Sequence, residues 1–381
     1  MKRLIVGVAT GLALASLVVG GCAQPAPAPT ATKAPAASTK AAAAPTTAAA
    51  PSAAVAASTK APAASTAAAP APTTAAAPAK SAFPAKDKSI SIVVPFTAGG
   101  VSDNSARILA GLMEKDLGVP VQVVNKAGAS TQVGLTEVAS AKPDGYTLGV
   151  PGLPTSCVTY LDSDRGATYS RKNFQPIALF VLDVISVAVG LDTPYKSIKD
   201  LADAGKANPG KIKMATTGLM SVNHLAPIAF EQATSAQFSY VHFPGGADAN
   251  TAILGGHADA QFSAVGNTTP HFKSEKMRVL GVMDQEESPF LPGIKTLAAQ
   301  GYNVNASTSY GLVAPAGTPK EVVDVLTAAV KKACANKEYI DRISAVYMTP
   351  KYLDPTAFGK FWDEVDEWAR PLVKVGKEQQ R

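Results

Sequence analysis

The residues with the clearest chemical potential form a small-residue turn, Thr97-Ala98-Gly99-Gly100, after a β-branched apolar run. That run predicts a buried strand from Ile90 to Val94, and helically spaced apolar residues after the turn predict a helix ending at Gly118. Ser102 or Asp103 is the expected N-cap. Small residues let a ligand approach the backbone amides, and a helix N-terminus favours an anion. The stretch predicts either an anion-binding turn or a plain tight connection.

No catalytic motif accompanies this turn. The four histidines, His224, His242, His257 and His271, lack the His-Glu-x-x-His spacing of a zinc site. The chain has no Gly-x-Ser-x-Gly elbow, and the Gly-Gly turn lacks the Lys-Ser/Thr ending of a phosphate loop. We therefore expect no metal and no cofactor, and we favour binding over catalysis without excluding an enzyme.

The elements that must position the turn follow a repeated strand, small loop and helix pattern, which predicts an α/β fold with parallel, helix-covered strands. The first set continues with strands at 119–124 and 146–150. The second set has strands at 212–216 and 239–243, followed by helices at 222–234 and 248–254. Further strands are expected at 184–190, 258–263 and 277–282. Further helices are expected from Ser197, with Asp200 completing a capping box, from Pro319, with Thr318 as its cap, and from Pro355. Aromatic residues of the last helix, Phe358, Phe361, Trp362 and Trp368, are expected to make core contacts.

The amino-terminal quarter of the chain differs from the rest. Residues 1–21 combine a basic start with an apolar run, which predicts an export signal more than a permanent transmembrane helix. Val19-Gly20-Gly21-Cys22 resembles the end of a bacterial lipoprotein signal, so Cys22 is expected to carry a lipid anchor. Residues 22–87 are rich in Ala, Pro and Thr and contain duplicated segments. They predict a disordered, semi-extended spacer rather than a helical rod.

The charge composition also changes at this boundary, and two of the three cysteines lie beyond it. Residues 1–86 hold seven Lys or Arg and no acid, leaving 28 basic against 29 acidic residues in the remainder. The net charge of +6 therefore belongs to the leader and spacer, and no basic block for nucleic acid is evident. Cys157 and Cys334 lie in an expected oxidising compartment, and the sequence leaves open whether they pair or stay separate buried thiols.

Four motifs together resemble the substrate-binding proteins of tripartite tricarboxylate transporters, the Bug family. They run from Val93 to Arg107, Val123 to Ala129, Lys142 to Leu148 and Gly311 to Pro319. The resemblance implies an α/β, type II-like periplasmic-binding-protein fold of two lobes with a hinged cleft between them. Lobe 1 would comprise residues 88–188 and 311–381, and lobe 2 residues 189–310. It also implies a small organic carboxylate ligand and two integral membrane permease subunits as partners.

The ligand-binding residues that the resemblance implies lie in two loops of each lobe. In lobe 1 they are Phe96, Thr97, Ala98, Gly99, Gly100, Ser102, Asp103, Gly128, Ala129 and Ser130, and in lobe 2 they are Thr217, Gly218, Met220, Ser221, Phe243, Gly245 and Gly246. Asp103 is open to either of two roles, contact with a ligand amine or hydroxyl, or capping of its helix. The sequence departs from the family pattern at Phe243-Pro244, in place of Tyr-Lys, and at Ala252, in place of an acid.

These observations predict a lipid-anchored solute-binding protein on the extracytoplasmic, periplasmic side of a membrane, whose lobes close on a small organic carboxylate. A monomer is expected. An enzyme on the same hinged fold is the alternative, and a surface adhesin or spacer lipoprotein is less favoured because small-residue loops occur in both halves of the folded part.

Overall fold

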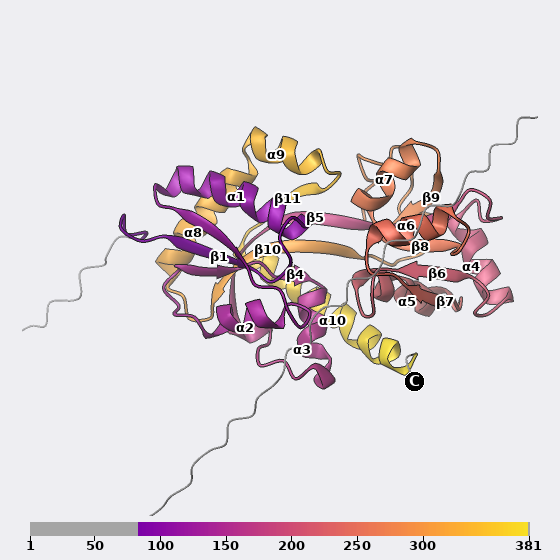
Figure 1. The fold of residues 1–381 in the computed structure, drawn as a ribbon, viewed down its shortest axis with the longest axis horizontal. Coiled ribbons are helices and arrows are strands. Elements are labelled where there is room, and N and C mark those ends of the chain that lie inside the picture. Colours follow the sequence, from indigo (N-terminus) through magenta and orange to yellow (C-terminus); the bar gives the residue numbers. More distant parts are fainter. Residues whose placement is uncertain (1–82, 380–381) are drawn as a thin grey trace, which may run out of the picture. The chain divides into compact units, whose positions relative to one another are not determined.

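The computed structural model describes residues 83–379, which form the α/β, two-lobed architecture that the sequence predicts (Figure 1). The expected export signal, Cys22 and nearly all of the spacer lie outside the described residues. No helix in the described part is long and apolar enough to cross a bilayer.

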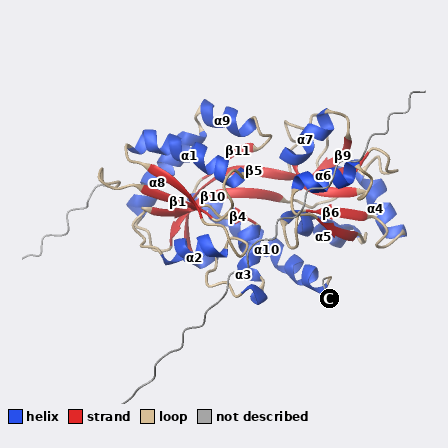
Figure 2. Cartoon of the chain, in the orientation of Figure 1, coloured by secondary structure: helices blue, strands red, loops and turns tan. Residues whose placement is uncertain are grey.

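The first lobe is built on strands in the order β2-β1-β3-β10-β5. β1 (Ile90–Val94) pairs in parallel with β2 (Val121–Asn125) and β3 (Thr147–Gly149). β10 (Ser307–Pro315) runs antiparallel to β3 and β5 (Phe174–Gly190), while the short β4 (Gly152–Leu153) and β11 (Thr349–Leu353) pair with β10 and β5. One face packs under α1 (Val101–Leu117), α8 (Lys320–Cys334) and α9 (Lys337–Ser344), and the other under α2 (Gln132–Ser140) and α3 (Thr155–Leu161) (Figure 2).

The second lobe continues the order as β5-β8-β6-β7. β6 (Lys213–Thr216) is parallel to β7 (Ser239–His242) and β8 (Ala260–Ala264), whereas β8 and β9 (Met277–Val282) run antiparallel to β5. One apolar cluster joins α4 (Ile198–Ala207) and α5 (Val222–Thr234) to the sheet, and a second joins α6 (Gly246–Leu254) and α7 (Val265–Lys273) to it. Short 3₁₀ turns lie at Ser163–Arg165, Arg171–Asn173 and Ala298–Gln300.

Strand β5 connects the lobes. Up to Val184 it pairs with β10, and from Ile185 it pairs with β8. The helix α10 (Pro355–Glu378) also contacts both lobes, because its first half packs Phe358 and Trp362 into the first lobe and its second half packs Leu372 against α5. The sheets therefore meet at a short segment around residues 183–185.

The two cysteines of the described part do not form a disulfide. Cys157 and Cys334 are free thiols, buried in different apolar clusters of the first lobe. The alternative of separate buried thiols is therefore the right one. Phe358 and Trp362 are fully buried as expected, which fits a packing role for these aromatic residues.

Several element boundaries differ from the sequence-based expectation. The strand expected at 184–190 begins ten residues earlier, at Phe174, because Pro176 and Asp183 interrupt its apolar pattern without ending it. The helix α8 starts at Lys320, and the Thr318 hydroxyl donates to the Pro315 carbonyl instead of capping the helix. The capping box of Ser197 and Asp200, and the start of α10 at Pro355, are as predicted.

Candidate ligand-binding site

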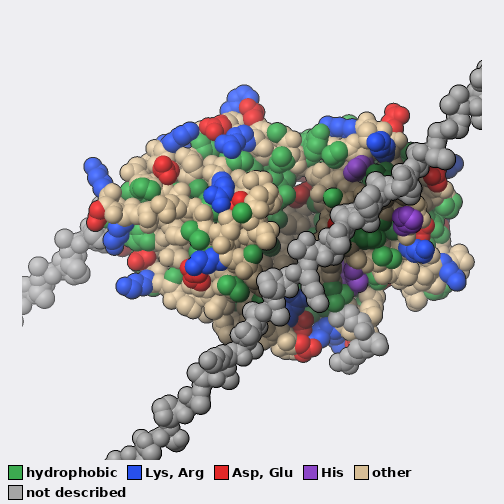
Figure 3. Space-filling view, in the orientation of Figure 1, with side chains coloured by type: hydrophobic (Ala, Val, Ile, Leu, Met, Phe, Trp, Pro, Cys, Tyr) green, Lys and Arg blue, Asp and Glu red, His purple; other side chains and the backbone are tan. Residues whose placement is uncertain are grey.

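All predicted ligand-binding residues follow the carboxyl ends of parallel strands. Residues 96–103 follow β1, 128–130 follow β2, 217–221 follow β6 and 243–246 follow β7. In open α/β sheets, ligands bind at this edge. The described surface is hollowed between the two lobes (Figure 3).

The turn after β1 presents an exposed backbone from Thr97 to Gly100. Gly99 adopts a φ of 81°, which favours glycine, whereas Gly100 is extended. A Cβ built on Gly100 would lie 3.5 Å from the Thr97 carbonyl oxygen, an ordinary contact. The protein itself therefore leaves room for a side chain at Gly100, so any exclusion of a side chain there must come from a ligand.

Asp103 holds this turn in place. The helix α1 begins at Val101 with Gly100 as its N-cap, so the expected cap at Ser102 or Asp103 is wrong. The Asp103 carboxylate instead accepts hydrogen bonds from the Gly99 amide (2.8 Å) and the Asn125 side chain (2.9 Å), and it pairs with Arg107 (2.9 Å). Burial would raise the pKa of Asp103, but the hydrogen bonds from Arg107, Gly99 and Asn125 bring it below the ordinary value. At 2% exposure, its carboxylate is used by the protein to fix the turn.

The loop after β2 has an unusual backbone. Gly128, Ala129, Ser130 and Thr131 all have positive φ values, of 147°, 44°, 51° and 82°. Such a run costs conformational energy and persists only where the surroundings hold it. Here Thr159 donates to the Ser130 carbonyl (2.6 Å) and the Thr131 hydroxyl bonds to that of Tyr169 (3.2 Å). The neighbouring helix α3 therefore supports an exposed, strained loop at the ligand edge.

Phe96 links the turn to the centre of the sheet. Its ring packs edge-on against Tyr310 of β10, with centroids 6.1 Å apart. A Cβ on Gly152 would lie 2.7 Å from the Phe96 ring and 3.1 Å from the Tyr310 ring, so this contact requires glycine in β4. Phe96 is therefore a packing residue as well as a predicted ligand contact.

In the second lobe, the loop after β6 divides into exposed and buried parts. Thr217, Gly218 and Ser221 are partly exposed, whereas Met220 is 3% exposed and packs with α5 and α10. Its backbone φ of 60° turns its amide toward His224, whose Nδ1 accepts it at 3.2 Å. The Met220 side chain therefore belongs to the core, and only its backbone lies at the loop.

Two histidines adjoin the second-lobe loops, His224 in α5 and His242 at the end of β7. The rings of His224 and His242 are 5.0 Å apart, and the His242 Nδ1 lies 2.6 Å from the Thr216 hydroxyl. Burial and the nearby His242 lower the pKa of His224 to about 4, and burial also lowers the pKa of His242. Both rings are therefore neutral at pH 7 and act as hydrogen-bonding groups.

The loop after β7 is anchored by backbone contacts. The Phe243 amide donates to the Thr216 carbonyl (2.8 Å), which ties this loop to the end of β6. Gly245 is the N-cap of α6, and a Cβ on Gly246 would lie 3.0 Å from the Asn267 side chain on α7. The small residues here allow α6 and α7 to approach each other.

The helices that begin at the predicted site share one property. No N-cap side chain caps α1, α5 or α6. Among the helices that begin at other loops, α4, α9 and α10 are capped by Ser197, Asn336 and Asp354, whereas α3, α7 and α8 have no side-chain cap either. The uncapped ends of α1, α5 and α6 follow the carboxyl ends of β1, β6 and β7, where the predicted ligand contacts lie. Uncapped N-terminal amides and the helix dipole favour an anion, and a carboxylate is the anion that fits the resemblance.

Two apolar residues that the sequence interpretation left out lie within these loops. Val101 and Leu219 are 42% and 44% exposed, next to Gly100 and Gly218 respectively. Large apolar side chains with this exposure in a ligand loop are a signal for contact with the carbon part of a ligand. The interpretation missed them because the family motif is carried by their glycine neighbours.

The structure gathers the predicted residues within each lobe but not across the two lobes. In the described part, no hydrogen bond or ion pair joins the first-lobe loops to the second-lobe loops, and no three His, Cys, Asp or Glu side chains are grouped to hold a metal.

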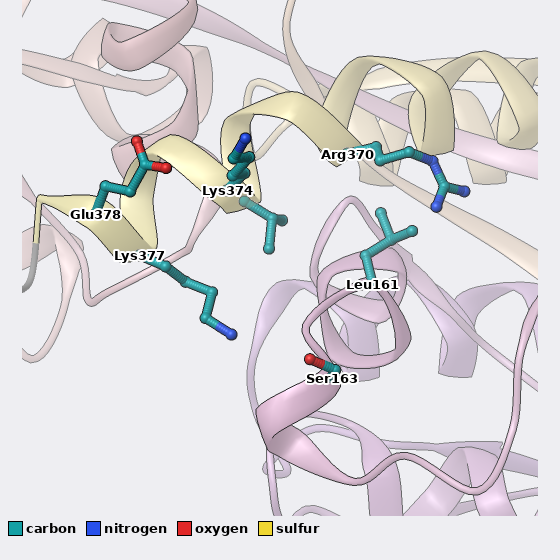
Figure 4. Close-up of a pocket in the computed structure, with 7 residues that line it drawn as sticks. Leu161, Ser163, Arg370, Lys374, Lys377 and Glu378 are labelled. Atoms are coloured by element: carbon teal, nitrogen blue, oxygen red, sulfur yellow. The ribbon is translucent and has the colours of Figure 1, made fainter.

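A separate cavity of about 290 Å³ lies between residues 161–163 and the end of α10 (Figure 4). Its basic side chains are Arg370, Lys374 and Lys377, but Lys377 already pairs with Asp162 and Asp164. None of the predicted ligand-binding residues lines it. We therefore do not assign it to the same site.

Fold and loops together define a two-lobed solute-binding protein. Residues 105–376 match the model of the family described as the tripartite tricarboxylate transporter family receptor, TctC. The chain therefore belongs to this family, and the resemblance found in its motifs is confirmed.

Relatives and solved structures agree with this assignment. The chain is 29% identical to protein BugT of Bordetella pertussis over 301 residues, which cover 77% of this chain and 90% of BugT. A TctC solute-binding protein from Polaromonas superposes with a TM-score of 0.70 at 27% identity, covering 77% of this chain and 99% of that one. MatC from Rhodopseudomonas palustris with bound malate superposes with a TM-score of 0.62 at 26% identity, covering 76% and 100%.

Proposed function

We propose that this chain captures a small organic carboxylate between its lobes and delivers it to a tripartite tricarboxylate-type membrane transporter, with two integral membrane permease subunits as partners. The uncapped N-termini of α1, α5 and α6 at the ligand edge carry the proposal, since they offer amides and positive dipole ends to an anion. The malate bound to the related MatC is a ligand of this chemical class.

The proposed ligand contacts are the loops named above. The carboxylate oxygens would accept from backbone amides within residues 97–100 and 128–130 in lobe 1, and within 217–221 and 243–246 in lobe 2. The amides of Gly99, Met220 and Phe243 already donate within the protein and are not among them, and Pro244 has no amide hydrogen. Val101 and Leu219 would cover the carbon chain on closure. Because charges in the folded part nearly balance, affinity should depend only weakly on salt.

Native mass spectrometry of the purified protein is the direct test. A co-purifying small carboxylate, or a thermal shift with one member of a carboxylate panel, is the expected result. Chemical conversion of that ligand during incubation would instead favour the alternative, an enzyme on the same fold. Failure of every carboxylate to bind would contradict both.

We further propose that Cys22 carries a lipid and holds the protein on the periplasmic side of a membrane. Replacing Cys22→Ser should release the protein from the membrane fraction without altering ligand affinity, because a long spacer separates residue 22 from the folded part. Fractionation by centrifugation measures the first effect and calorimetry the second. A variant that stays with the membrane would refute the lipid anchor.

A further inference from the structure

A single acid lies where the two sheets meet. Asp183 is the only charged residue of the 17-residue strand β5, and it is 6% exposed. It pairs with Thr308 of β10, two residues before Ile185, where β5 begins to pair with β8. In the described part, no lysine or arginine forms an ion pair with its carboxylate, whose hydrogen bond comes from the Gly266 amide at 3.5 Å.

The register shows which way Asp183 faces. Thr308 lies opposite Asp183 and Tyr310 opposite Val181, so Asp183 and Tyr310 project from the same face of the sheet. The ring of Tyr310 contacts Phe96 at the start of the β1 turn. The opposite face, which carries Leu182 and Ser307, lines a separate cavity beneath α10.

The same carboxylate also adjoins the second lobe. Gly266 and Asn267 are in the first turn of α7, and Asn267 contacts the position of Gly246 in the β7 loop. Asp183 is therefore connected to the lobe 1 loop through Tyr310 and Phe96, and to the lobe 2 loop through α7. Asp183 thus lies at the junction of the two sheets, between elements that lead to the predicted contacts of both lobes.

We propose that Asp183 is a specificity-determining residue that accepts a hydrogen bond from the ligand. The proposal rests on the proposed carboxylate function. The site would then prefer a carboxylate that also carries a donor, an ammonium group first and a hydroxyl second, because an acid without a cationic partner gains most from a positive donor.

The electrostatics of the surrounding elements fit this role. Burial raises the pKa of Asp183 to about 7, an effect that the Gly266 amide partly opposes. On β10 the facing titratable group is Tyr310, whose pKa is raised by burial and by Asp183. Tyr347, on the turn before β11, adjoins Gly266, and the Lys273 ammonium of α7 lies over its ring, 4.6 Å from the centroid. Among the described residues, no charged side chain shifts the pKa of Asp183. A bound ammonium would favour the ionised carboxylate.

Calorimetry on matched acids tests the proposal. The pairs are succinate and aspartate, glutarate and glutamate, and 3-phenylpropionate and phenylalanine, with malate as the hydroxyl member and both enantiomers of each chiral acid. The expected result is that the amino member of the pair that fits binds about ten- to a hundredfold more tightly than its parent acid. In Asp183→Asn this preference should disappear while the parent acid binds as well as before or better.

Asp284→Asn is the matched control, because Asp284 is a partly buried aspartate near the lobe junction that lines the cavity beneath α10 instead. It should leave the preference unchanged. Equal binding of parent and amino acids in the wild type, or an unchanged preference in a folded Asp183→Asn protein, would overturn the proposal while leaving carboxylate binding intact. Binding of no acid in this set, followed by no binding in the wider carboxylate panel, would contradict the carboxylate function itself.

Discussion

At the scale of single residues, the structure shows which glycines the fold itself requires and which it does not. Gly99 needs its positive φ, Gly152 needs its missing side chain to seat Phe96, and Gly100 needs neither within the protein. The sequence could not make this distinction, because it shows which residues are glycine but not what surrounds each one. Gly100 is therefore the informative position to change.

Replacing Gly100→Val should abolish carboxylate binding, because the new side chain would occupy the space in front of the exposed amides. The cost to the free energy of unfolding should stay below about 1 kcal/mol, since the backbone is extended and the nearest protein atom allows a Cβ. Calorimetry and urea unfolding measure the two effects. Gly111→Val is the control, because Gly111 lies within α1, the helix that begins after Gly100, and has open space around it. Wild-type affinity in a folded Gly100→Val protein would show that this turn only connects strand to helix.

Asp183 should make stability depend on pH in a particular direction. Its folded pKa of about 7 exceeds the ordinary 3.8, so the folded state holds the proton more tightly. Stability should therefore fall as pH rises between these values, by about 4 kcal/mol at most. Asp183→Asn removes this loss and should be more stable than the wild type at pH 8, with a smaller difference at pH 4. Urea unfolding at both pH values checks this, and equal stability at pH 8 would argue against a buried carboxylate.

At the scale of elements, the strand, loop and helix units were predictable and their long-range connections were not. The helix at 222–234 and the strand at 277–282 have the predicted bounds, because local apolar periodicity determines them. The full length of β5 was missed because Asp183 breaks the apolar pattern, although the strand pairs with β10 on both sides of Asp183, with two register shifts further along. Pairing between distant segments leaves no local signal, so the position of the lobe junction was not available from the sequence.

The predicted site shows the same limit. The loops were identified by motif, but the burial of Met220 and the exposure of Leu219 follow from how α5 packs against α10. Likewise the role of Asp103 in fixing the turn depends on Asn125, which is distant in sequence and belongs to the next strand. The sequence could therefore locate the site without assigning side chains to ligand or core.

The loop between β6 and α5 should be sensitive to acid. His224 accepts the Met220 amide through Nδ1, and its pKa of about 4 lies below the ordinary 6.5. Neutral His224 should contribute about 3 kcal/mol to the free energy of unfolding. This contribution should be fully present above pH 6.5 and lost as the pH falls through 4. In His224→Asn, the asparagine oxygen can still accept the Met220 amide hydrogen, and stability should fall less as the pH is lowered. Unfolding free energies across pH 4–7 measure it, with the exposed His257→Asn as control. If the unfolding free energy changed with pH equally in both variants, His224 would not be the cause of the acid sensitivity.

At the scale of the whole molecule, two elements contact both lobes, β5 and α10. Strand β5 passes from one sheet to the other, and α10 contributes to an apolar cluster in each lobe. The ligand loops project beyond the carboxyl ends of the strands, whereas the chain enters β1 at its amino end. The attachment of the spacer and the proposed ligand edge are thus at opposite ends of the same strand, so a spacer can tether the protein without occupying the site.

The boundary between spacer and folded part can be located by deletion. Phe83 packs its ring 5.1 Å from that of Tyr146, and the Ala85 amide donates to the Tyr146 hydroxyl at 2.8 Å. In the protein lacking its leader, removing residues 23–80 should leave the free energy of unfolding unchanged, because that segment has little apolar surface to bury.

Extending the deletion to residue 85 should lower the free energy of unfolding by about 1–3 kcal/mol, because the burial of the Phe83 ring and one hydrogen bond are lost. Phe83→Ala in the undeleted chain should reproduce most of this loss, and urea unfolding compares the three. A large loss on the shorter deletion would show that the spacer itself packs on the folded part, and no loss on the longer one would place the boundary beyond Ala85.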